Sequence, residues 1–274
     1  MKSNFLIIGG DKRQQYLKKA LEEKSQDVFH LKYSADIWVL DEIERFSHII
    51  LPIPLSKDKE YIYSKDNLNL TVNELIKYIK PCHTVFGSGF DSKTADFFED
   101  NHIEFFDFMK DKIFKRANAY LTAQGTLKLM LDNTEDYIVS KKALIIGFGD
   151  VGQTLAEILR NNGLEVYITA RNIRKLSLAA MNGYKTVSFS SFGSCIYLFD
   201  YIFGSVPVNV LDSDDVRNMK KDCCYIELAS PPFTAVESDF KEHSKVYING
   251  SALPGRFLPL ASGKLMADFI LNNL

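Results

Sequence analysis

Short apolar runs alternate with amphipathic segments along most of the chain, and this alternation predicts a parallel α/β protein. In the first half, the apolar runs are typical of strands, and the segments between them carry apolar residues at helical spacing. The predicted strands are 4–10, 27–33, 48–53, 83–89 and 103–108, and the predicted helices are 14–23, 41–46, 71–80 and 92–101. Because helices that join parallel strands cover both faces of the sheet, the first half predicts one layered domain.

A second alternating series follows a long helical segment, 111–133, and a polar stretch. Its predicted strands are 142–149, 164–170, 184–189, 201–206, 223–229 and 245–250. We therefore expect two tandem parallel-sheet α/β domains. Residues 1–135 would form a flavodoxin-like substrate domain that ends in the linking helix, and residues 136–274 would form a Rossmann dinucleotide-binding domain. The tail 259–273 predicts a terminal helix, which we expect to pack back on the first domain.

The clearest chemical signal is the segment GFGDVG, which fits the dinucleotide-binding pattern G-x-G-x-x-G. It follows a predicted strand and opens an amphipathic helix, which is the context that this pattern requires. The first glycine permits the tight turn, the second lets the backbone approach a pyrophosphate, and the third allows close packing of the helix on the strand. The unpaired N–H groups at the start of the helix would face the phosphates. The expected cofactor contacts in this segment are Gly147, Gly149, Asp150, Val151 and Gly152.

The end of the next predicted strand bears on the choice between NAD and NADP. An enzyme that uses NAD usually has Asp or Glu there, which accepts hydrogen bonds from the ribose 2′-hydroxyl. This chain has Thr169, Ala170 and Arg171 instead, followed by Arg174 and Lys175. No carboxylate is present to repel a 2′-phosphate, and the guanidinium of Arg171 can pair with one. The sequence therefore favours NADP(H), with NAD(H) as the alternative, and Thr169 and Arg171 as cofactor contacts.

Further candidate residues lie in loops that follow predicted strands, because ligands of doubly wound domains bind beyond the carboxyl ends of the strands. Val206 and Pro207 lie where dehydrogenases commonly line the nicotinamide pocket. Arg256, in a Pro-Gly turn, is a candidate to clamp a carboxylate. The first strand is followed by Asp11 and Arg13 instead of a third glycine, so this turn suits a small anionic substrate better than a second dinucleotide.

Composition and charge exclude several other classes of protein. With 46% apolar residues, 25% charged residues and a formal net charge of −2, the chain is typical of a globular protein and has no basic surplus for nucleic acid. Its apolar runs are too short for a membrane span. Its cysteines lack the spacing of metal ligands, and this pattern indicates free thiols in a reducing cytoplasm. Neither HExxH nor a G-x-S-x-G elbow occurs, so neither a metal site nor hydrolytic chemistry is expected. Hydride transfer fits better, because the cofactor itself carries that reaction.

A set of motifs spread along the chain occurs in a distinctive order. The motifs are IIGGDKRQQYL, LPIPLS, NAYLTAQGTLKLML, GFGDVGQTLAEIL, TAR and ALPGRFLPLASG. Together they resemble the A-subunit family of dipicolinate synthase from about residue 5 to residue 263. The resemblance implies NADP-dependent oxidation of a dihydrodipicolinate-level precursor to pyridine-2,6-dicarboxylate in the mother cell during sporulation. It also implies a partner, the flavoprotein-like B subunit, and we expect a homo-oligomer.

The motifs transfer to this chain residue by residue, with one departure that concerns catalysis. The residues that match the family outside the glycine segment are Asp11, Arg13, Gln14, Thr122, Ala123, Gly125, Arg171, Leu253, Pro254 and Gly255. We expect Arg13 and Arg256 to grip the two carboxylates of the substrate, with Asp11 and Thr122 as further substrate contacts. The family usually has Glu where this chain has Gln124, so no general base is identified. The alternatives are a non-catalytic NADP-binding scaffold or regulatory subunit, and a small-acid dehydrogenase of the alanine or shikimate dehydrogenase type.

Overall fold

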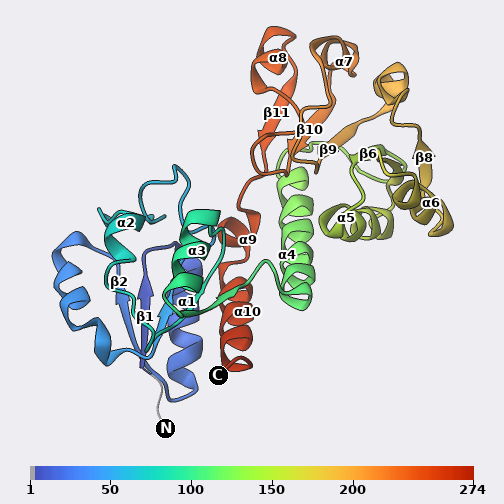
Figure 1. Cartoon of the computed structure of the whole chain (residues 1–274). Coiled ribbons are helices and arrows are strands. Elements are labelled where there is room, and N and C mark those ends of the chain that lie inside the picture. The colour runs from blue at the N-terminus through green and yellow to red at the C-terminus, as the bar shows by residue number, and fades with distance from the viewer. Residues whose placement is uncertain (1–3) are drawn as a thin grey trace. The chain divides into compact units, whose positions relative to one another are not determined.

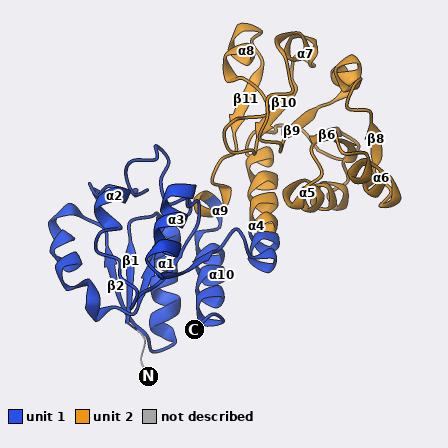
Figure 2. Cartoon of the chain, in the orientation of Figure 1, with its two compact units in different colours: residues 1–118, 257–274 blue, residues 119–256 orange. Residues whose placement is uncertain are grey.

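The computed structural model describes residues 4–274, and the chain divides into two compact units (Figures 1 and 2). Unit 1 comprises the chain as far as Asn118 together with Phe257–Leu274, and unit 2 is Ala119–Arg256. Helix α4 (Lys112–Leu131) therefore begins in unit 1 and ends in unit 2, whereas the sequence pattern predicts the division after this helix. Within the described residues, no helix combines the length and the apolar character that crossing a membrane requires.

Unit 1 contains a five-stranded sheet in which all neighbouring strands are parallel. The strand order is β2-β1-β3-β4-β5, which is that of flavodoxin-like doubly wound folds. The strands are β1 (Asn4–Ile8), β2 (Asp27–Leu31), β3 (His48–Ile50), β4 (Thr84–Gly87) and β5 (Glu104–Asp107). The helices are α1 (Lys12–Glu23), the 3₁₀ segment η1 (Ser34–Arg45), α2 (Val72–Leu75), α3 (Ser92–Asp100) and α10 (Pro259–Leu271).

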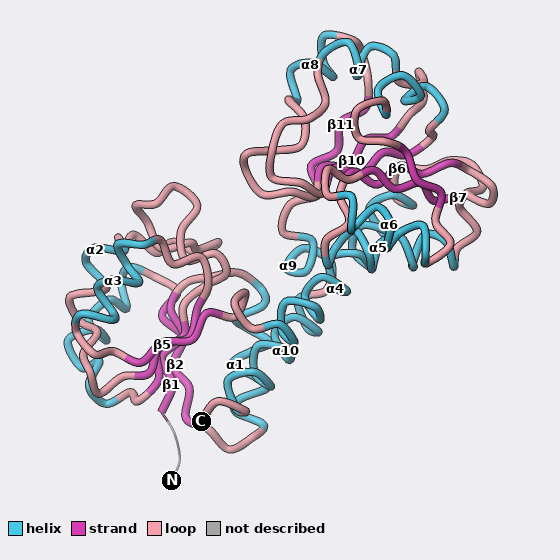
Figure 3. Tube along the Cα trace, turned by 45° about the vertical axis from the view of Figure 1, so that its right-hand side comes forward, coloured by secondary structure: helices cyan, strands magenta, loops and turns pink. Residues whose placement is uncertain are grey.

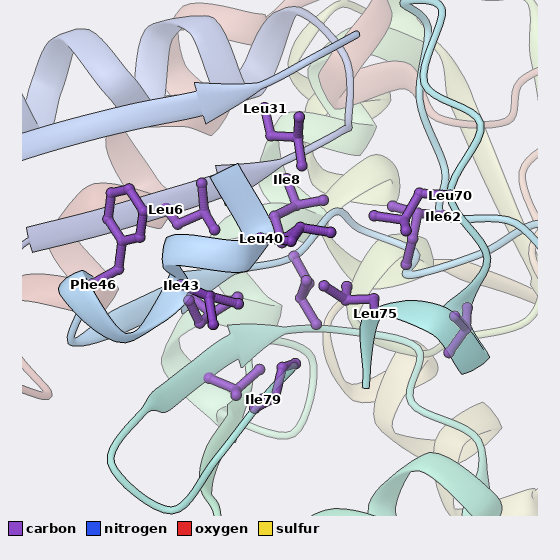
Figure 4. Close-up of a cluster of buried hydrophobic side chains, with 14 of the residues drawn as sticks. Leu6, Ile8, Leu31, Leu40, Ile43, Phe46, Ile62, Leu70, Leu75 and Ile79 are labelled. Carbon is purple, nitrogen blue, oxygen red and sulfur yellow. The ribbon is translucent and has the colours of Figure 1, made fainter. Parts of the chain in front are cut away.

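Helices cover both faces of this sheet, so successive residues of β1 are buried on opposite sides. Ile7 belongs to a cluster that includes Leu17 of α1 and Met266 of α10. On the other face, Leu6 belongs to a second cluster with Ile43 of η1, which Figure 4 shows together with other side chains of that cluster. The C-terminal helix α10 thus completes the core of unit 1.

Unit 2 contains a six-stranded parallel sheet in the order β11-β10-β9-β6-β7-β8. This is the Rossmann order, in which two three-stranded halves meet between β6 and β9. The strands are β6 (Lys142–Ile146), β7 (Glu165–Thr169), β8 (Lys185–Val187), β9 (Tyr201–Gly204), β10 (Cys224–Glu227) and β11 (Val246–Asn249). The other elements are α5 (Asp150–Asn161), α6 (Ile173–Met181), the 3₁₀ segment η2 (Phe192–Leu198), α7 (Ser213–Asn218), α8 (Glu237–Glu242) and α9 (Leu253–Phe257), which ends in unit 1.

Helices lie on both sides of the sheet in unit 2 as well. Figures 1 and 3 show α5 and α6 on one side and α7 and α8 on the other. The predicted fold class, two tandem parallel-sheet α/β domains of which the second is a Rossmann fold, is confirmed. The carboxyl ends of β6 and β9 are neighbours at the point where the strand order reverses, and that is where such sheets bind their ligands.

Candidate functional site

Two glycines shape the turn between β6 and α5 by steric necessity. Gly147 has φ of +109°, and a Cβ atom there would lie 2.6 Å from Ser205 Oγ and 2.7 Å from Val206 Cγ1. A Cβ on Gly152 would lie 2.4 Å from the carbonyl oxygen of Gly147. The turn is therefore tight, and α5 packs directly against it, as the sequence pattern predicts for its first and third glycines.

Gly149 differs from both, because a Cβ atom there would meet no other atom within 4 Å. It is the N-cap of α5 and, as a glycine, it has no side chain to accept a hydrogen bond from the N–H groups of the first turn. Asp150 and Val151 open this helix, whose dipole is positive at that end. The open side of Gly149 and the uncapped helix start form a cradle that fits a pyrophosphate.

Thr169 lies at the other side of this turn, at the end of β7. Its carbonyl oxygen accepts a hydrogen bond from the N–H of Gly147, with the two atoms 2.8 Å apart. Its side-chain oxygen is buried and has no hydrogen-bond partner among residues 4–274. Because a buried hydroxyl without a partner is costly, a polar group of a ligand is the expected partner for this oxygen. These residues together fit a dinucleotide.

Arg171 follows the end of β7 and is exposed. It forms no hydrogen bond or ion pair with any residue between 4 and 274. The next residue, Asn172, caps α6 by accepting hydrogen bonds from the N–H groups of Arg174 and Lys175 at 2.9 and 3.4 Å. The first turn of α6 contains no acidic residue. The guanidinium of Arg171 is therefore available to an anion, and no carboxylate lies beside it in the sequence.

The loop after β9 carries the other two predicted cofactor contacts. Val206 is half-buried and Pro207 is exposed. Ser205 ties this loop to the end of β6, because its N–H and its hydroxyl both donate to the carbonyl oxygen of Ile146, at 3.0 and 2.9 Å. Since Gly147 packs against the same loop, the two predicted cofactor segments meet at the reversal point of the sheet.

Glu227, at the end of β10, was not among the predicted site residues. Its side chain is buried, with 1% of the residue exposed. Burial raises the pKa of Glu227 above its ordinary value, although hydrogen bonds from Tyr225 and from the backbone act in the opposite direction. A glutamate that ends an apolar strand is the signal that could have drawn attention to it, because buried charges need partners.

In unit 1, Asp11 and Arg13 form a buried ion pair after β1. The Nε and Nη2 atoms of Arg13 donate to the two carboxylate oxygens of Asp11, each at 2.9 Å, and Nη2 also donates to the carbonyl oxygen of Ile53 at 2.7 Å. Nη1 has no hydrogen-bond partner within residues 4–274. Burial raises the pKa of Asp11, but the hydrogen bonds and charge of Arg13 outweigh it, and the pKa lies below its ordinary value.

Tyr63 and Lys57 extend this cluster, and neither was among the predicted site residues. The hydroxyl of Tyr63 donates to Asp11 at 3.3 Å, and burial raises the pKa of Tyr63 to about 12. The ammonium nitrogen of Lys57 lies 4.1 Å from the centroid of the Tyr63 ring. Desolvation lowers the pKa of Lys57, and the charge of Lys65 adds to that effect. The positively charged side chains of Arg13 and Lys57 are thus concentrated at the turn after β1.

In unit 2, the linking helix α4 contacts the short helix α9, a segment that the sequence pattern predicts to be a Pro-Gly turn. A Cβ on Gly125 would lie 2.9 Å from the Cβ of Leu253, so these two segments are in close contact. Thr122 is half-buried and Gln124 is exposed. The Nη1 atom of Arg256 donates to the carbonyl oxygen of Asn249 at 2.8 Å, which holds this exposed arginine against the end of β11. Across residues 4–274, no group of three or more His, Cys, Asp or Glu side chains is placed to hold a metal ion.

Two family models match the chain, and together they cover most of it. Residues 4–109 match the N-terminal domain of the dipicolinate synthase A subunit. Residues 118–237 match the NAD-binding domain of S-adenosyl-L-homocysteine hydrolase. The second match covers the glycine turn, Arg171 and Glu227, and it shows that this region is of the NAD-binding type.

Similar proteins include one curated relative that matches over most of both chains. The dipicolinate synthase A subunit of Bacillus subtilis (strain 168) is 23% identical over 292 residues, which cover 96% of this chain and 93% of that protein. The crystal structure of the Bacillus halodurans dipicolinate synthase A subunit superposes with a TM-score of 0.84 at 20% identity, covering 99% and 97% of the two chains. The apo-structure of D-lactate dehydrogenase from Escherichia coli superposes with a TM-score of 0.70 at 11% identity, covering 98% and 95%. The resemblance predicted from the ordered motifs is confirmed.

Proposed function

Because the chain is related to the dipicolinate synthase A-subunit family over nearly its whole length, we propose that it is the nicotinamide-dependent component of such a synthase. It would oxidise a dihydrodipicolinate-level precursor to pyridine-2,6-dicarboxylate with NADP. The NAD-binding domain supports the coarser conclusion, an oxidoreductase subunit. The observation that carries the finer proposal is the open cradle at Gly149 together with the unpaired guanidinium of Arg171.

In unit 2, residues from the two halves of the sheet would bind different parts of the cofactor. The start of α5, with Gly149, Asp150 and Val151, would hold the pyrophosphate. Arg171 would pair with the 2′-phosphate, which separates NADP from NAD. The loop with Val206 and Pro207 would lie along the nicotinamide half. Bound NADP+ would supply the acceptor for the hydride, and aromatisation of the ring would favour the reaction.

The substrate contacts are proposed separately for each unit. In unit 1, Arg13 would use its remaining nitrogen, Nη1, to bind a carboxylate, with Asp11 holding the guanidinium in place. In unit 2, Arg256 and Thr122 would provide the further contacts. A dicarboxylate withdrawn from water needs cations of this kind. We also propose that the chain has a flavoprotein-like B subunit for its partner, that it self-associates, and that it acts in the cytoplasm of the mother cell during spore formation.

The proposal is tested by reconstituting the reaction. The purified full chain, the B subunit of the synthase and freshly generated precursor are mixed with NADP+ or with NAD+, and the absorbance of the reduced cofactor and of the product is followed. We expect both to rise together, and faster with NADP+. Product formation without any reduced cofactor, or no reduced cofactor at all in the complete mixture, would reject the proposal.

The presence of Gln124 favours a second candidate function. The resemblance implies a glutamate at this position, and an amide cannot accept a proton as a carboxylate can. The second candidate is therefore an NADP-binding scaffold whose partner performs the chemistry. The same mixture distinguishes the two: the scaffold would bind NADPH but would reduce no NADP+, whether or not the flavoprotein-like partner is present.

A further inference from the structure

The buried carboxylate of Glu227 gathers four hydrogen bonds. Its Oε2 atom accepts from the Tyr225 hydroxyl at 2.7 Å, from the N–H of Thr234 at 2.9 Å and from the N–H of Ala235 at 3.2 Å. Its Oε1 atom accepts from the N–H of Ala229 at 2.9 Å. All of these partners are uncharged donors. The carboxylate therefore fastens the segment 229–235 to the end of β10.

Thr234 links the segment 229–235 to the loop after β9 by hydrogen bonds. Its hydroxyl donates to the carbonyl oxygen of Val206 at 2.8 Å, and it accepts from the N–H of Val206 at 3.3 Å. Gly204 makes the close packing possible, because a Cβ there would lie 2.1 Å from the Tyr225 hydroxyl oxygen and 2.7 Å from Thr234 Cβ. The order of contacts is thus Glu227 to Thr234 to Val206.

The loop after β9, which contains Val206, belongs to the second half of the Rossmann sheet. β9 is the first strand of that half and lies directly beside β6. The glycine turn and Arg171 belong to the first half, which in this fold takes the adenine nucleotide, so the other half takes the nicotinamide nucleotide. The loop with Val206 therefore lies on the nicotinamide side of the sheet, and hydrogen bonds through Thr234 connect it to Glu227.

We propose that Glu227 is a positioning residue for the nicotinamide half of the dinucleotide and acts through Thr234 on the backbone of Val206. The inference rests on the proposed function only as far as dinucleotide binding. It does not depend on which substrate is oxidised. Because every partner of the carboxylate is a donor, an amide in its place would turn an NH₂ group toward other donors and leave at least one of them unpaired.

The test compares two ligands that differ in the nicotinamide half. The dissociation constants of NADPH and of 2′-phospho-ADP-ribose, which lacks the nicotinamide, are measured on the full chain by calorimetric titration. We expect Glu227→Gln to weaken NADPH binding by about tenfold or more, equivalent to about 1.4 kcal/mol, and to leave 2′-phospho-ADP-ribose binding unchanged. The unchanged second affinity shows at the same time that the variant is folded.

Thr234→Val provides a second, independent variant. It removes the hydroxyl that contacts Val206 and keeps the N–H that donates to Glu227, so we expect the same selective loss of NADPH affinity. Glu237→Gln is the matched control: this glutamate lies on α8 with 52% of its side chain exposed, and we expect no change with either ligand.

Unchanged NADPH affinity in Thr234→Val, or an equal loss for both ligands in the two variants, would overturn the proposal. If the wild type binds both ligands but oxidises no precursor, the proposed reaction fails and the positioning role of Glu227 stands.

Discussion

Arg171 is the residue on which the choice of cofactor depends most. Its exposed guanidinium has no partner in the described part of the chain, and a hydrogen bond between charged groups contributes about 1.5–3 kcal/mol. We predict that Arg171→Ala weakens NADPH binding by about tenfold or more and leaves NADH binding unchanged, since only NADPH carries the 2′-phosphate. Titration of each ligand into each protein measures this. Arg217→Ala, another exposed arginine with 61% of its side chain accessible, serves as control. Equal NADPH affinity in Arg171→Ala and the wild type would contradict the assignment.

His30 makes the stability of unit 1 sensitive to acid. Its Nε2 atom forms a hydrogen bond with the Gly9 carbonyl oxygen at 2.8 Å, and its Nδ1 atom is buried and has no partner in the described part of the chain. Burial lowers the pKa of His30 from 6.5 to about 4. The charges of Lys18 and Lys32 lower it further, while the hydrogen bond with Gly9 and the charge of Asp66 oppose the shift.

The sign of the effect follows from the lowered pKa. As the pH falls from 6.5 towards 4, the unfolded chain takes up a proton on His30 and the folded chain does not. The contribution to stability is therefore complete above pH 6.5 and is lost down to about pH 4, up to about 3 kcal/mol in all. We predict that His30→Gln has a smaller loss of unfolding free energy over this range, measured by urea denaturation at each pH. Parallel curves for the two proteins would refute this.

The residues that the sequence could single out are those whose proposed role depends on neighbours along the chain. The three glycines serve one turn, and Arg171 follows the strand that ends beside that turn. Glu227 could not be assigned in this way, because its role depends on Thr234 and Val206, which only the fold brings to it. Lys57 was given no role for the same reason, since the ring of Tyr63 that it contacts lies in a different part of the loop.

At the level of elements, two glycines of the turn between β6 and α5 have different proposed roles. Gly152 is needed for packing, and Gly149 is needed for binding the ligand. We predict that Gly152→Ala destabilises the protein by about 1–3 kcal/mol, because its Cβ would press on the carbonyl of Gly147 at 2.4 Å. Gly149→Ala meets open space, so we expect its stability to change by less than about 1 kcal/mol. It should nevertheless weaken dinucleotide binding by about tenfold or more, because the methyl group occupies the approach of the pyrophosphate.

Denaturation and NADPH titration of the two glycine variants check this contrast. A Gly149→Ala protein that binds NADPH as the wild type does would show that the cradle is not the phosphate site.

Most strands could be located from the sequence because they are buried on both faces and appear as continuous apolar runs. The segment 54–70 could not be assigned, because it has neither strand nor helix periodicity. In the structure, Ile62, Leu68 and Leu70 nevertheless belong to the core of unit 1. Isolated bridges hold the segment in place, including the one between Gly10 and Ser64. Helix α2 is shorter than the predicted helix 71–80, because it ends at Leu75 and residues 76–78 form a turn.

At the level of the whole molecule, both ends of the described chain contribute to unit 1. Helix α10 packs on α1 so closely that a Cβ on Gly263 would lie 2.7 Å from the carbonyl oxygen of Arg13 and 2.8 Å from the N–H nitrogen of Leu17. We predict that Gly263→Val lowers the free energy of unfolding by about 1–3 kcal/mol, since it presses on backbone that cannot move aside. Ala261→Val, an exposed position on the same helix, controls for helix propensity. Equal stability of the two variants in urea would contradict this packing.

The ordered motifs along the whole chain led further towards function than any single element, because a Rossmann fold serves many reactions. They indicated the relative that covers 96% of this chain, but they leave the reaction itself as a proposal. That reaction requires a hydride to pass from the substrate to the cofactor. The most direct measurement uses precursor that carries deuterium at the ring carbon that loses the hydride, mixed with the full chain, the flavoprotein-like B subunit of the synthase and NADP+. Mass spectrometry of the reduced cofactor should show deuterated NADPH, formed in step with pyridine-2,6-dicarboxylate. Formation of the dicarboxylate with unlabelled NADPH, or with no NADPH, would contradict the account.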